Sequence, residues 1–410
     1  MRKRVGIIGG GAAGMMAAIT AARCGAEVTI LEGGERIGKK LLSTGNGKCN
    51  LGNEALSADC YYGSCAFLSE CFSDFGVKET QDFFEGLGVL LRSKNGYLYP
   101  YAEQASIVLD ALRFEIEALG IQVETQARVS GIRVQKDGTF AVESSKGVRR
   151  FDCVILACGS KAAPKTGSDG SGYDLAKSLG HRIVPVMPAL TALKCKESFF
   201  KAVAGVRAEA LIRLWNRDGK SIQEERGELQ LTDYGISGIP TFQLSRTAAY
   251  MLQKQKEVSV TIDFLPDVDD AQLESIASKR MEMRGNRSVE ELFNGLANKK
   301  VMALLIKLQG LKAMDSSKDL SKKDILGVLQ LTKKLKVTAI GTGDFQNCQV
   351  SAGGVDPSQI DRTMESKLIK GLYIVGELLD VDGRCGGYNL QWAWTSGYLA
   401  GKNAAGGEAK

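Results

Sequence analysis

The sequence predicts an α/β protein in which both ends of the chain form one domain and the middle is inserted into it. Three observations support this. A glycine-rich turn lies between an apolar run and a helix-like segment near the amino terminus, at residues 5–24. A second apolar run, ending in an acid and followed by a glycine-rich segment, lies at residues 371–391. Between them, residues 189–262 alternate short strand-like runs with charged turns.

Length and composition are those of a water-soluble globular protein. The 410 residues are 44% apolar and 24% charged, and a chain of this length is expected to form two or three domains. The net charge of +6 is too small to indicate a nucleic-acid partner. Ten cysteines without a recognisable signal peptide indicate reduced thiols and a cytoplasmic protein. No cysteine spacing fits a zinc or iron–sulfur site, so no metal is expected and the group Cys60, Cys65 and Cys71 has no assigned role.

The uncharged run from Val5 to Ala22 has the composition of a signal peptide or of the start of a membrane span. Five glycines within it argue against a membrane helix, and their spacing indicates a nucleotide-binding turn instead. No other stretch is long enough to cross a bilayer. We therefore expect no association with a membrane.

The first element is a nucleotide-binding βαβ unit. Val5 to Ile8 is a short apolar run typical of a buried parallel strand. Gly9 to Gly14 fits G-x-G-x-x-G, Met15 to Cys24 has helical character, and a second strand from Glu27 to Leu31 ends at Glu32. A lone glycine fingerprint is weak evidence. A dinucleotide site is strongly predicted by the full order of elements, which is strand, fingerprint, helix, strand and acid.

Each part of this unit has a physical role. Gly9 permits the tight turn, Gly11 allows the pyrophosphate to approach the backbone, and Gly14 allows the helix to pack closely on the strand. The amino terminus of the helix offers N–H groups and a partial positive charge to the phosphates. Glu32 is placed to accept the ribose hydroxyls, and an acid rather than an arginine there favours FAD or NAD over NADP.

Three further segments favour FAD over NAD. Residues 36–50 are rich in Gly, Asn, Ser and Thr and can lie along an extended cofactor. Residues 151–159 form a buried strand that ends in small residues, and residues 371–377 form a strand that ends in Glu377. The glycine-rich segment 380–391 then leads into a helix over 392–400, whose amino terminus would stabilise negative charge at the N1/O2 edge of the flavin. In an NAD enzyme the carboxyl-terminal part of the chain does not need to contact the cofactor, so this segment favours FAD.

At this point the chain resembles the BaiN-like flavoproteins, a family that includes aminoacetone oxidase and a bile-acid C=C reductase. The resemblance runs over nearly the whole chain and is most specific in the segment Val-Asp-Gly-Arg-Cys-Gly-Gly-Tyr-Asn-Leu-Gln-Trp at 381–392. It also includes residues 39–50, 166–172, 234–238, 350–355 and 363–367. It implies a Rossmann-like FAD-binding domain formed by both chain ends, with an inserted middle.

The sequence departs from the family pattern at two positions. Family members often have arginine before the Cys-Asn pair, where this chain has Lys48. Many also have a histidine two residues before the Gly-Ile-Ser-Gly stretch, where this chain has Asp233. The second departure argues against a mechanism that uses a histidine at that position.

The inserted region is expected to carry the substrate pocket. We assign residues 1–188 and 339–410 to the FAD-binding domain and 189–338 to an inserted domain, β-rich and barrel-like over 189–264 and helical over 265–338. Its strands are predicted at 190–193, 209–214, 228–231 and 258–262. The lysine-rich stretch 318–336 lacks aromatic residues for base stacking and contains two aspartates, so we interpret it as a solvated helix.

The predicted FAD contacts come from both ends of the chain and from the strand at 151–159. They are Gly9, Gly11, Ala12, Ala13, Gly14, Glu32, Gly33, Lys39, Lys40, Leu41, Thr44, Gly45, Asn46, Cys49, Asn50, Val129, Ala157, Cys158, Gly159, Gly376, Glu377, Asp382, Gly387, Tyr388, Asn389 and Leu390.

The candidate catalytic residues are Tyr388 and Arg384, because their motif is expected at the flavin edge, together with Cys49 and Cys385. For the two cysteines, packing at a crowded turn is the competing interpretation. The only histidine, His181, is expected to be structural, and Tyr234 is as consistent with turn packing as with the substrate side.

Only one complete dinucleotide fingerprint is present, so NAD(P)H is expected as a transient co-substrate rather than as a second bound cofactor. The leading hypothesis is NAD(P)H-dependent reduction of an activated C=C bond in an apolar, steroid-like, bile-acid-like or other enone, by hydride transfer through flavin N5. The alternative is an aminoacetone-type amine oxidase that uses O2 and releases H2O2. A third hypothesis, a flavoprotein that binds a macromolecular partner such as RNA, has only residues 318–336 in its support. The sequence leaves the substrate and the oligomeric state open.

Overall fold

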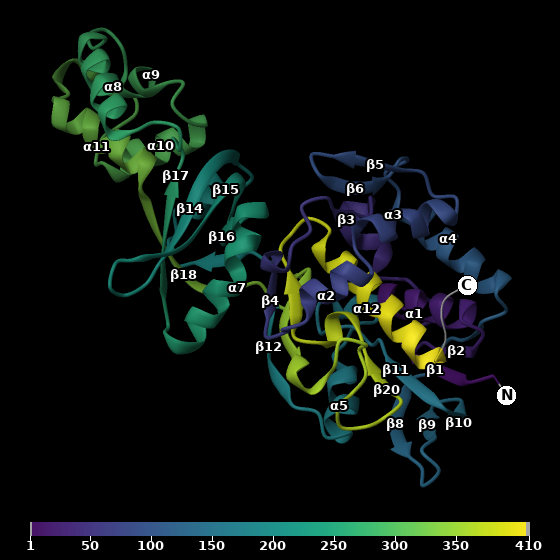
Figure 1. Cartoon of the computed structure of the whole chain (residues 1–410). Helices are drawn as coiled ribbons and strands as arrows, with labels where there is room; N and C mark the ends of the chain where they lie inside the picture. Colours follow the sequence, from purple (N-terminus) through teal and green to yellow (C-terminus); the bar gives the residue numbers. More distant parts are fainter. Residues whose placement is uncertain (1, 407–410) are drawn as a thin grey trace. The chain divides into compact units, whose positions relative to one another are not determined.

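A computed structural model gives the structure of residues 2–406; residue 1 and residues 407–410, at the ends of the predicted FAD-binding domain, lie outside the described part. The chain divides into two compact units, Met1–Met187 with Phe345–Lys410, and Pro188–Asp344 (Figure 1). Each unit has its own apolar core. Over residues 2–406, the search for a helix both long enough and apolar enough to cross a membrane finds none.

A parallel sheet of five strands forms the centre of the first unit, in the order β20-β11-β1-β2-β7. Its strands other than the edge strand β7 are mostly buried apolar runs, as expected where both faces of a sheet are covered. The sheet draws strands from both ends of the chain: β1 (Arg4–Ile8), β2 (Glu27–Leu31), β7 (Gln122–Glu124), β11 (Cys153–Leu156) and β20 (Leu372–Ile374). This topology confirms the predicted Rossmann-like α/β class.

Two helices, α1 (Ala12–Arg23) and α12 (Tyr388–Ala405), lie against each other beside this sheet (Figure 1). They approach closely because α12 presents glycines to α1. A Cβ at Gly397 would overlap with the carbonyl oxygen of Ala13, and one at Gly401 with that of Ala17. The carboxyl-terminal helix is thereby fixed to the helix that begins at the glycine fingerprint.

Smaller elements surround the sheet in the first unit. Strands β4 (Tyr61–Gly63) and β21 (Val381–Gly383) pair with each other and join the two chain ends again. The remaining strands are β3 (Gly52–Asn53), β5 (Leu91–Lys94), β6 (Tyr97–Pro100), β8 (Val129–Val134), β9 (Phe140–Ser144), β10 (Gly147–Phe151), β12 (Ile183–Ala189) and β19 (Val350–Val355). The remaining helices are α2 (Leu68–Asp74), α3 (Val77–Gly86), α4 (Ala105–Ala118) and α5 (Ser171–Ser178).

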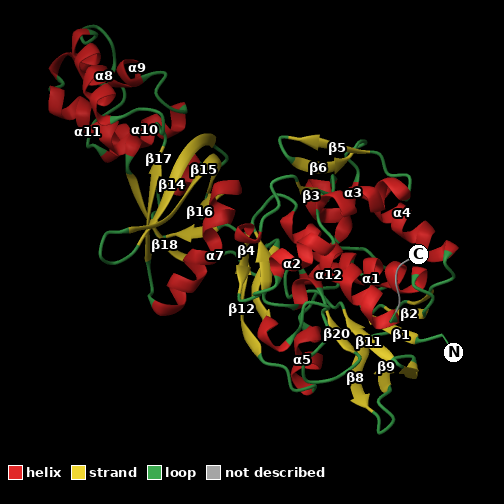
Figure 2. Cartoon of the chain, in the orientation of Figure 1, coloured by secondary structure: helices red, strands yellow, loops and turns green. Residues whose placement is uncertain are grey.

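The second unit is a closed antiparallel barrel with helices (Figure 2). Its strand order is β13-β16-β15-β14-β17-β18, and apolar side chains fill its core. The strands are β13 (Leu193–Cys195), β14 (Arg207–Trp215), β15 (Ser221–Thr232), β16 (Gly235–Ser237), β17 (Val258–Asp263) and β18 (Leu335–Thr342). The helices are α6 (Phe200–Val203), α7 (Ile239–Lys254), α8 (Asp270–Glu282), α9 (Val289–Phe293), α10 (Lys299–Leu308) and α11 (Lys322–Lys333).

Details of this unit differ from the sequence-based expectation. The strand predicted at 190–193 begins only at Leu193, because Leu190 has a left-handed φ of 49° that a strand does not accommodate. The segment expected to be β-rich also contains the long helix α7. Strand β18 begins inside the segment expected to be helical and runs past residue 338, because it closes the barrel against β17 and β13. The second unit therefore ends at Asp344.

Candidate functional site

The glycine fingerprint forms a tight turn between β1 and α1 that tolerates no side chain at two positions. Gly9 has a φ of 105°, and a Cβ there would lie 2.5 Å from the carbonyl oxygen of Ala157. A Cβ on Gly14 would overlap with the carbonyl oxygen of Gly9. Gly11 differs, because a Cβ built there meets no atom within 4 Å. The turn therefore leaves open space at Gly11, at the amino terminus of α1, where a pyrophosphate would sit.

Glu32 lies at the end of β2, beside this turn. Its Oε2 accepts a hydrogen bond of 2.8 Å from the Gly10 N–H, and its Oε1 accepts one of 2.7 Å from the Gly34 N–H. The Ala127 N–H donates to the Glu32 carbonyl oxygen at 2.8 Å, and Arg128, which directly precedes Val129 at the start of β8, lies beside Gly33. An acid held at the mouth of a glycine turn fits a dinucleotide ribose, so the residues present fit FAD.

An ion pair joins the loop after β2 to the carboxyl-terminal part of the chain. Lys40 Nζ lies 2.5 Å from Glu377 Oε2, and Ser160 Oγ donates to the same oxygen at 3.1 Å. Two predicted cofactor segments, together with the residue that follows the segment 151–159, thus meet at one carboxylate, which follows the turn at Gly376 (φ 65°). The neighbouring Lys39 is exposed.

The loop continues as a turn with left-handed backbone at Gly45, Asn46 and Cys49, whose φ values are 56°, 55° and 56°. Thr44 Oγ1 donates to the carbonyl oxygen of Leu41 at 2.7 Å and fixes the first part of the turn. The Cys49 side chain is fully buried, and burial raises the pKa of its thiol to about 12. A thiol in this environment stays protonated at neutral pH.

Asn50 links this loop to the amino terminus of α12. With its amide oriented to satisfy both ends, Asn50 donates to the carbonyl oxygens of Gly52 (2.8 Å) and Leu98 (3.2 Å) and accepts from the Gly387 N–H (3.3 Å). Gly387 has a φ of 94°, and a Cβ there would overlap with the carbonyl oxygen of Gly52. The residue before α12 must therefore be glycine.

Tyr388, the first residue of α12, has a buried ring. It meets the Tyr61 ring edge-on at 5.9 Å between centroids, and the Tyr61 hydroxyl donates to its carbonyl oxygen at 2.8 Å. Burial and a hydrogen bond with Cys60 raise the pKa of the Tyr388 phenol to about 12. The Arg384 N–H donates to the Cys60 carbonyl oxygen at 2.9 Å. The catalytic roles of Tyr388 and Arg384 stay predictions.

The other predicted FAD contacts also lie in the first unit. Asn389 Oδ1 accepts from the Gly383 N–H at 2.8 Å, and its Nδ2 donates to the Gly383 carbonyl oxygen at 2.9 Å. Cys158 Sγ lies 3.4 Å from the Ile8 carbonyl oxygen, and burial raises the pKa of its thiol to about 12. Burial also raises the pKa of the Cys385 thiol. The remaining residues are Ala12, Ala13 and Leu390, on the two helices, Ala157 and Gly159, after β11, and the buried Asp382 in β21.

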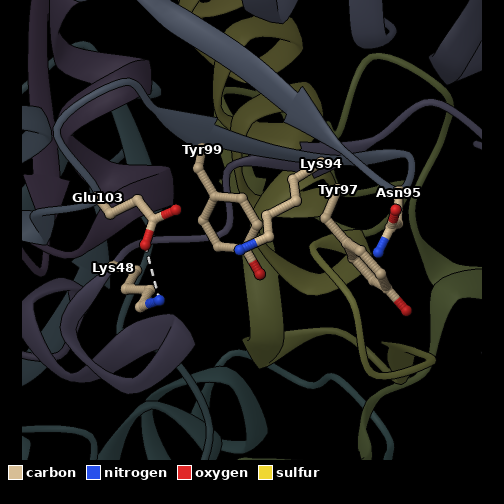
Figure 3. Close-up of a pocket in the computed structure, with 6 residues that line it drawn as sticks. All are labelled: Lys48, Lys94, Asn95, Tyr97, Tyr99 and Glu103. Atoms are coloured by element: carbon tan, nitrogen blue, oxygen red, sulfur yellow. Dashed lines mark ion pairs between the residues drawn. The ribbon is translucent and has the colours of Figure 1, made fainter.

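A pocket of about 200 Å³ opens beside these segments (Figure 3). It is lined by Lys48, Lys94, Asn95, Tyr97, Tyr99 and Glu103. None of these residues is among the predicted contacts, although the sequence contained a signal for the hairpin that holds most of them. Asn95-Gly96 between two short strand-like runs is typical of a tight β-hairpin turn.

Three other features considered in the sequence are His181, Tyr234 and the basic stretch 318–336. His181 is buried, with Nε2 2.9 Å from Ser366 Oγ. Tyr234 is 47% exposed in the turn between β15 and β16. In the basic stretch, Lys333 Nζ donates to Asp263 Oδ2 at 2.9 Å and to two backbone carbonyl oxygens. The positive charge of Lys333 is therefore paired within the second unit. Among residues 2–406, no cluster of three His, Cys, Asp or Glu side chains is placed to hold a metal.

Comparison with known proteins places the chain in a family. The family model described as HI0933-like protein Rossmann domain matches residues 3–403. The 3-dehydro-bile acid delta(4,6)-reductase of Clostridium scindens is 43% identical over 98% of this chain and 99% of its own length. The ribosomal RNA dihydrouridine synthase of Haemophilus influenzae is 29% identical over 96% of each chain. A solved 3-ketosteroid-delta4-(5alpha)-dehydrogenase from Rhodococcus jostii is 14% identical, covers 99% of this chain and 100% of its own, and has a TM-score of 0.48.

Proposed function

Since the chain belongs to the HI0933-like protein Rossmann domain family and is an FAD-dependent oxidoreductase, we propose that it reduces an activated C=C bond of an apolar enone with NAD(P)H as the hydride donor. The substrate class is steroid-like or bile-acid-like. The observation that carries the proposal is the end-to-end similarity to a reductase of unsaturated bile acids.

FAD supplies two-electron hydride transfer when it is bound. The residues expected to hold it are those of the fingerprint turn and α1, with Glu32 at the ribose and Glu377 and Lys40 farther along the cofactor. The amino terminus of α12, with Gly387 fixed against Asn50, would place partial positive charge beside the flavin. These residues bind and orient the cofactor.

The test is an anaerobic titration of the purified, FAD-loaded protein with NADH and then with NADPH. We expect one of the two to bleach the visible absorbance of the holoenzyme quickly. Adding a 3-dehydro bile acid with double bonds at positions 4 and 6 should then restore the absorbance and yield a product with fewer double bonds, detected by mass spectrometry. The saturated 3-dehydro bile acid is the matched control and should restore nothing.

Two other outcomes would redirect the proposal. If neither nucleotide bleaches the holoenzyme, but aminoacetone with O2 yields H2O2, the amine-oxidase hypothesis replaces it. If a nucleotide bleaches the holoenzyme and no enone restores the absorbance, the enone is wrong as a substrate class. Ribosomal RNA transcripts are then the next acceptors to test, because a relative is named as acting on ribosomal RNA.

A further inference from the structure

The pocket of Figure 3 is lined almost entirely by hydrogen-bond donors. Lys48 and Lys94 offer ammonium groups, Tyr97 and Tyr99 offer phenols, and Asn95 offers an amide. The only carboxylate is Glu103, and it is already paired with Lys48 at 2.7 Å and with Arg92. An oxygen of a ligand can accept hydrogen bonds from these donors, and the excess of positive charge favours an oxygen that carries negative charge.

The hairpin β5–β6 explains why the phenols share this pocket. Along β6, Leu98 and Pro100 are buried while the alternating Tyr97 and Tyr99 are only partly buried, as expected for a strand with one face on the core. Figure 3 shows Tyr99 between the Lys48–Glu103 ion pair on one side and Tyr97 on the other. Burial, with smaller effects from Tyr97 and Glu103, raises the pKa of the Tyr99 phenol, so it is a hydrogen-bond donor at neutral pH.

The pocket adjoins both chain segments that are expected to hold the flavin. Lys48 directly precedes Cys49 and Asn50. On the other side, a Cβ at Gly386 would lie 2.5 Å from the Tyr97 ring, and Asn53 Nδ2 donates to the Gly386 carbonyl oxygen at 2.9 Å. At about 200 Å³ the pocket is smaller than the roughly 300–1,000 Å³ of sites that enclose a whole ligand. It accommodates one polar end of a larger molecule.

We propose that this pocket binds the carbonyl oxygen of the enone substrate, with the Tyr99 hydroxyl as the principal hydrogen-bond donor and Lys94 as the supporting charge. The inference rests on the proposed function, since it assigns a role within that reaction. Tyr97 forms the wall between this oxygen site and the glycine-rich segment at 386.

The chemistry requires such a site. The hydride that NAD(P)H supplies to the enzyme ends on the carbon at the far end of the conjugated system and forms a C–H bond there. The π bond of the C=C breaks, and its electron pair moves to the carbonyl oxygen. Tyr99 and Lys94 stabilise the negative charge on that oxygen. The C=O bond then re-forms as a carbon of the enolate takes a proton from water. The balance is one hydride and one proton added to the substrate, with NAD(P)⁺ released.

The binding test uses the FAD-loaded protein and para-nitrophenol, a probe that can be presented neutral or ionised by choice of pH. Calorimetric titrations on either side of its ionisation compare wild type with Tyr99→Phe and Lys94→Gln. We expect Tyr99→Phe to weaken binding of the ionised probe by about tenfold or more, and binding of the neutral probe much less. Lys94 is exposed, so Lys94→Gln should give a smaller loss with the same preference for the ionised form.

Tyr101→Phe is the matched control, because Tyr101 follows the same strand, is 58% exposed and does not line the pocket. It should bind the probe as wild type does. In turnover with the unsaturated bile acid, Tyr99→Phe should lower kcat on the order of 100-fold with little change in KM, as for a donor that acts on developing charge.

The two readouts separate the pocket from the reaction. If Tyr99→Phe and Tyr101→Phe bind the ionised probe equally, the oxygen site is wrong whatever the turnover shows. If wild type reduces no enone, but Tyr99→Phe binds the ionised probe more weakly than wild type does, the pocket is an oxyanion site and the proposed reaction is wrong.

Discussion

Gly397 of α12 packs directly on the carbonyl oxygen of Ala13 in α1, so closely that even a methyl group at position 397 would overlap with it. The contact repeats one turn later, between Gly401 and Ala17. Because α1 starts at the fingerprint turn and α12 starts at Gly387, this crossing joins the two segments expected to hold the cofactor. The position of α12 therefore depends on glycine at the crossing.

Gly397→Ala should destabilise the protein by about 1–3 kcal/mol, because overpacking at a backbone contact forces the helices apart. FAD retention should fall with it, measured as the flavin-to-protein ratio after gel filtration. Gly86→Ala is the control, since a Cβ at Gly86 meets no atom within 4 Å. A variant Gly397→Ala as stable as Gly86→Ala would contradict the close crossing.

Glu32→Gln should weaken FAD binding about 10- to 100-fold, since hydrogen bonds to a charged acceptor contribute about 1.5–3 kcal/mol. The measurement is calorimetric titration of the apoprotein with FAD. Glu27→Gln, an exposed position on the same strand, should bind as wild type does. Equal affinities for the two variants would remove Glu32 from the cofactor site.

Cys49 should resist alkylation by iodoacetamide in the folded protein at mildly alkaline pH. Its thiol is fully buried and burial raises its pKa to about 12, so almost no thiolate is present. Peptide mass spectrometry should find Cys49 modified only after unfolding in urea. Labelling of native Cys49 at the rate seen for partly exposed cysteines such as Cys24 would show that it is accessible and reactive.

His181 should make stability depend on pH in a defined window. Burial lowers its pKa in the folded state from the ordinary 6.5, so below pH 6.5 the unfolded chain binds a proton that the folded chain does not. Its contribution to stability is present above pH 6.5 and is lost as the pH falls below 6.5 towards the lowered pKa of the folded state.

Urea unfolding at several pH values measures this loss. Because His181 is the only histidine in the chain, His181→Gln should flatten the pH dependence of stability just below about pH 6.5, whatever its effect on overall stability. An unchanged slope in the variant would assign the pH dependence to other groups.

Elements whose signal is local could be predicted from the sequence. The fingerprint turn, β1, α1 and β2 follow from glycine spacing and a short run of apolar residues, and β14 and β17 from alternation. The family resemblance was also readable, because its motifs are contiguous in sequence. The hairpin β5–β6 was missed although its Asn95-Gly96 turn is a local signal, since the surrounding strands are only four residues long.

The sequence by itself determined the fold class, the dinucleotide fingerprint and the return of the carboxyl-terminal segment to the cofactor domain. Only the tertiary structure decided that Lys40 pairs with Glu377, that the Tyr388 ring is buried against Tyr61, and that Tyr97 and Tyr99 face a pocket with Lys48. The physical reason is distance along the chain. Backbone conformation and periodicity are set by neighbouring residues, whereas burial, ion pairing and pocket lining depend on groups that folding brings together from remote parts of the sequence.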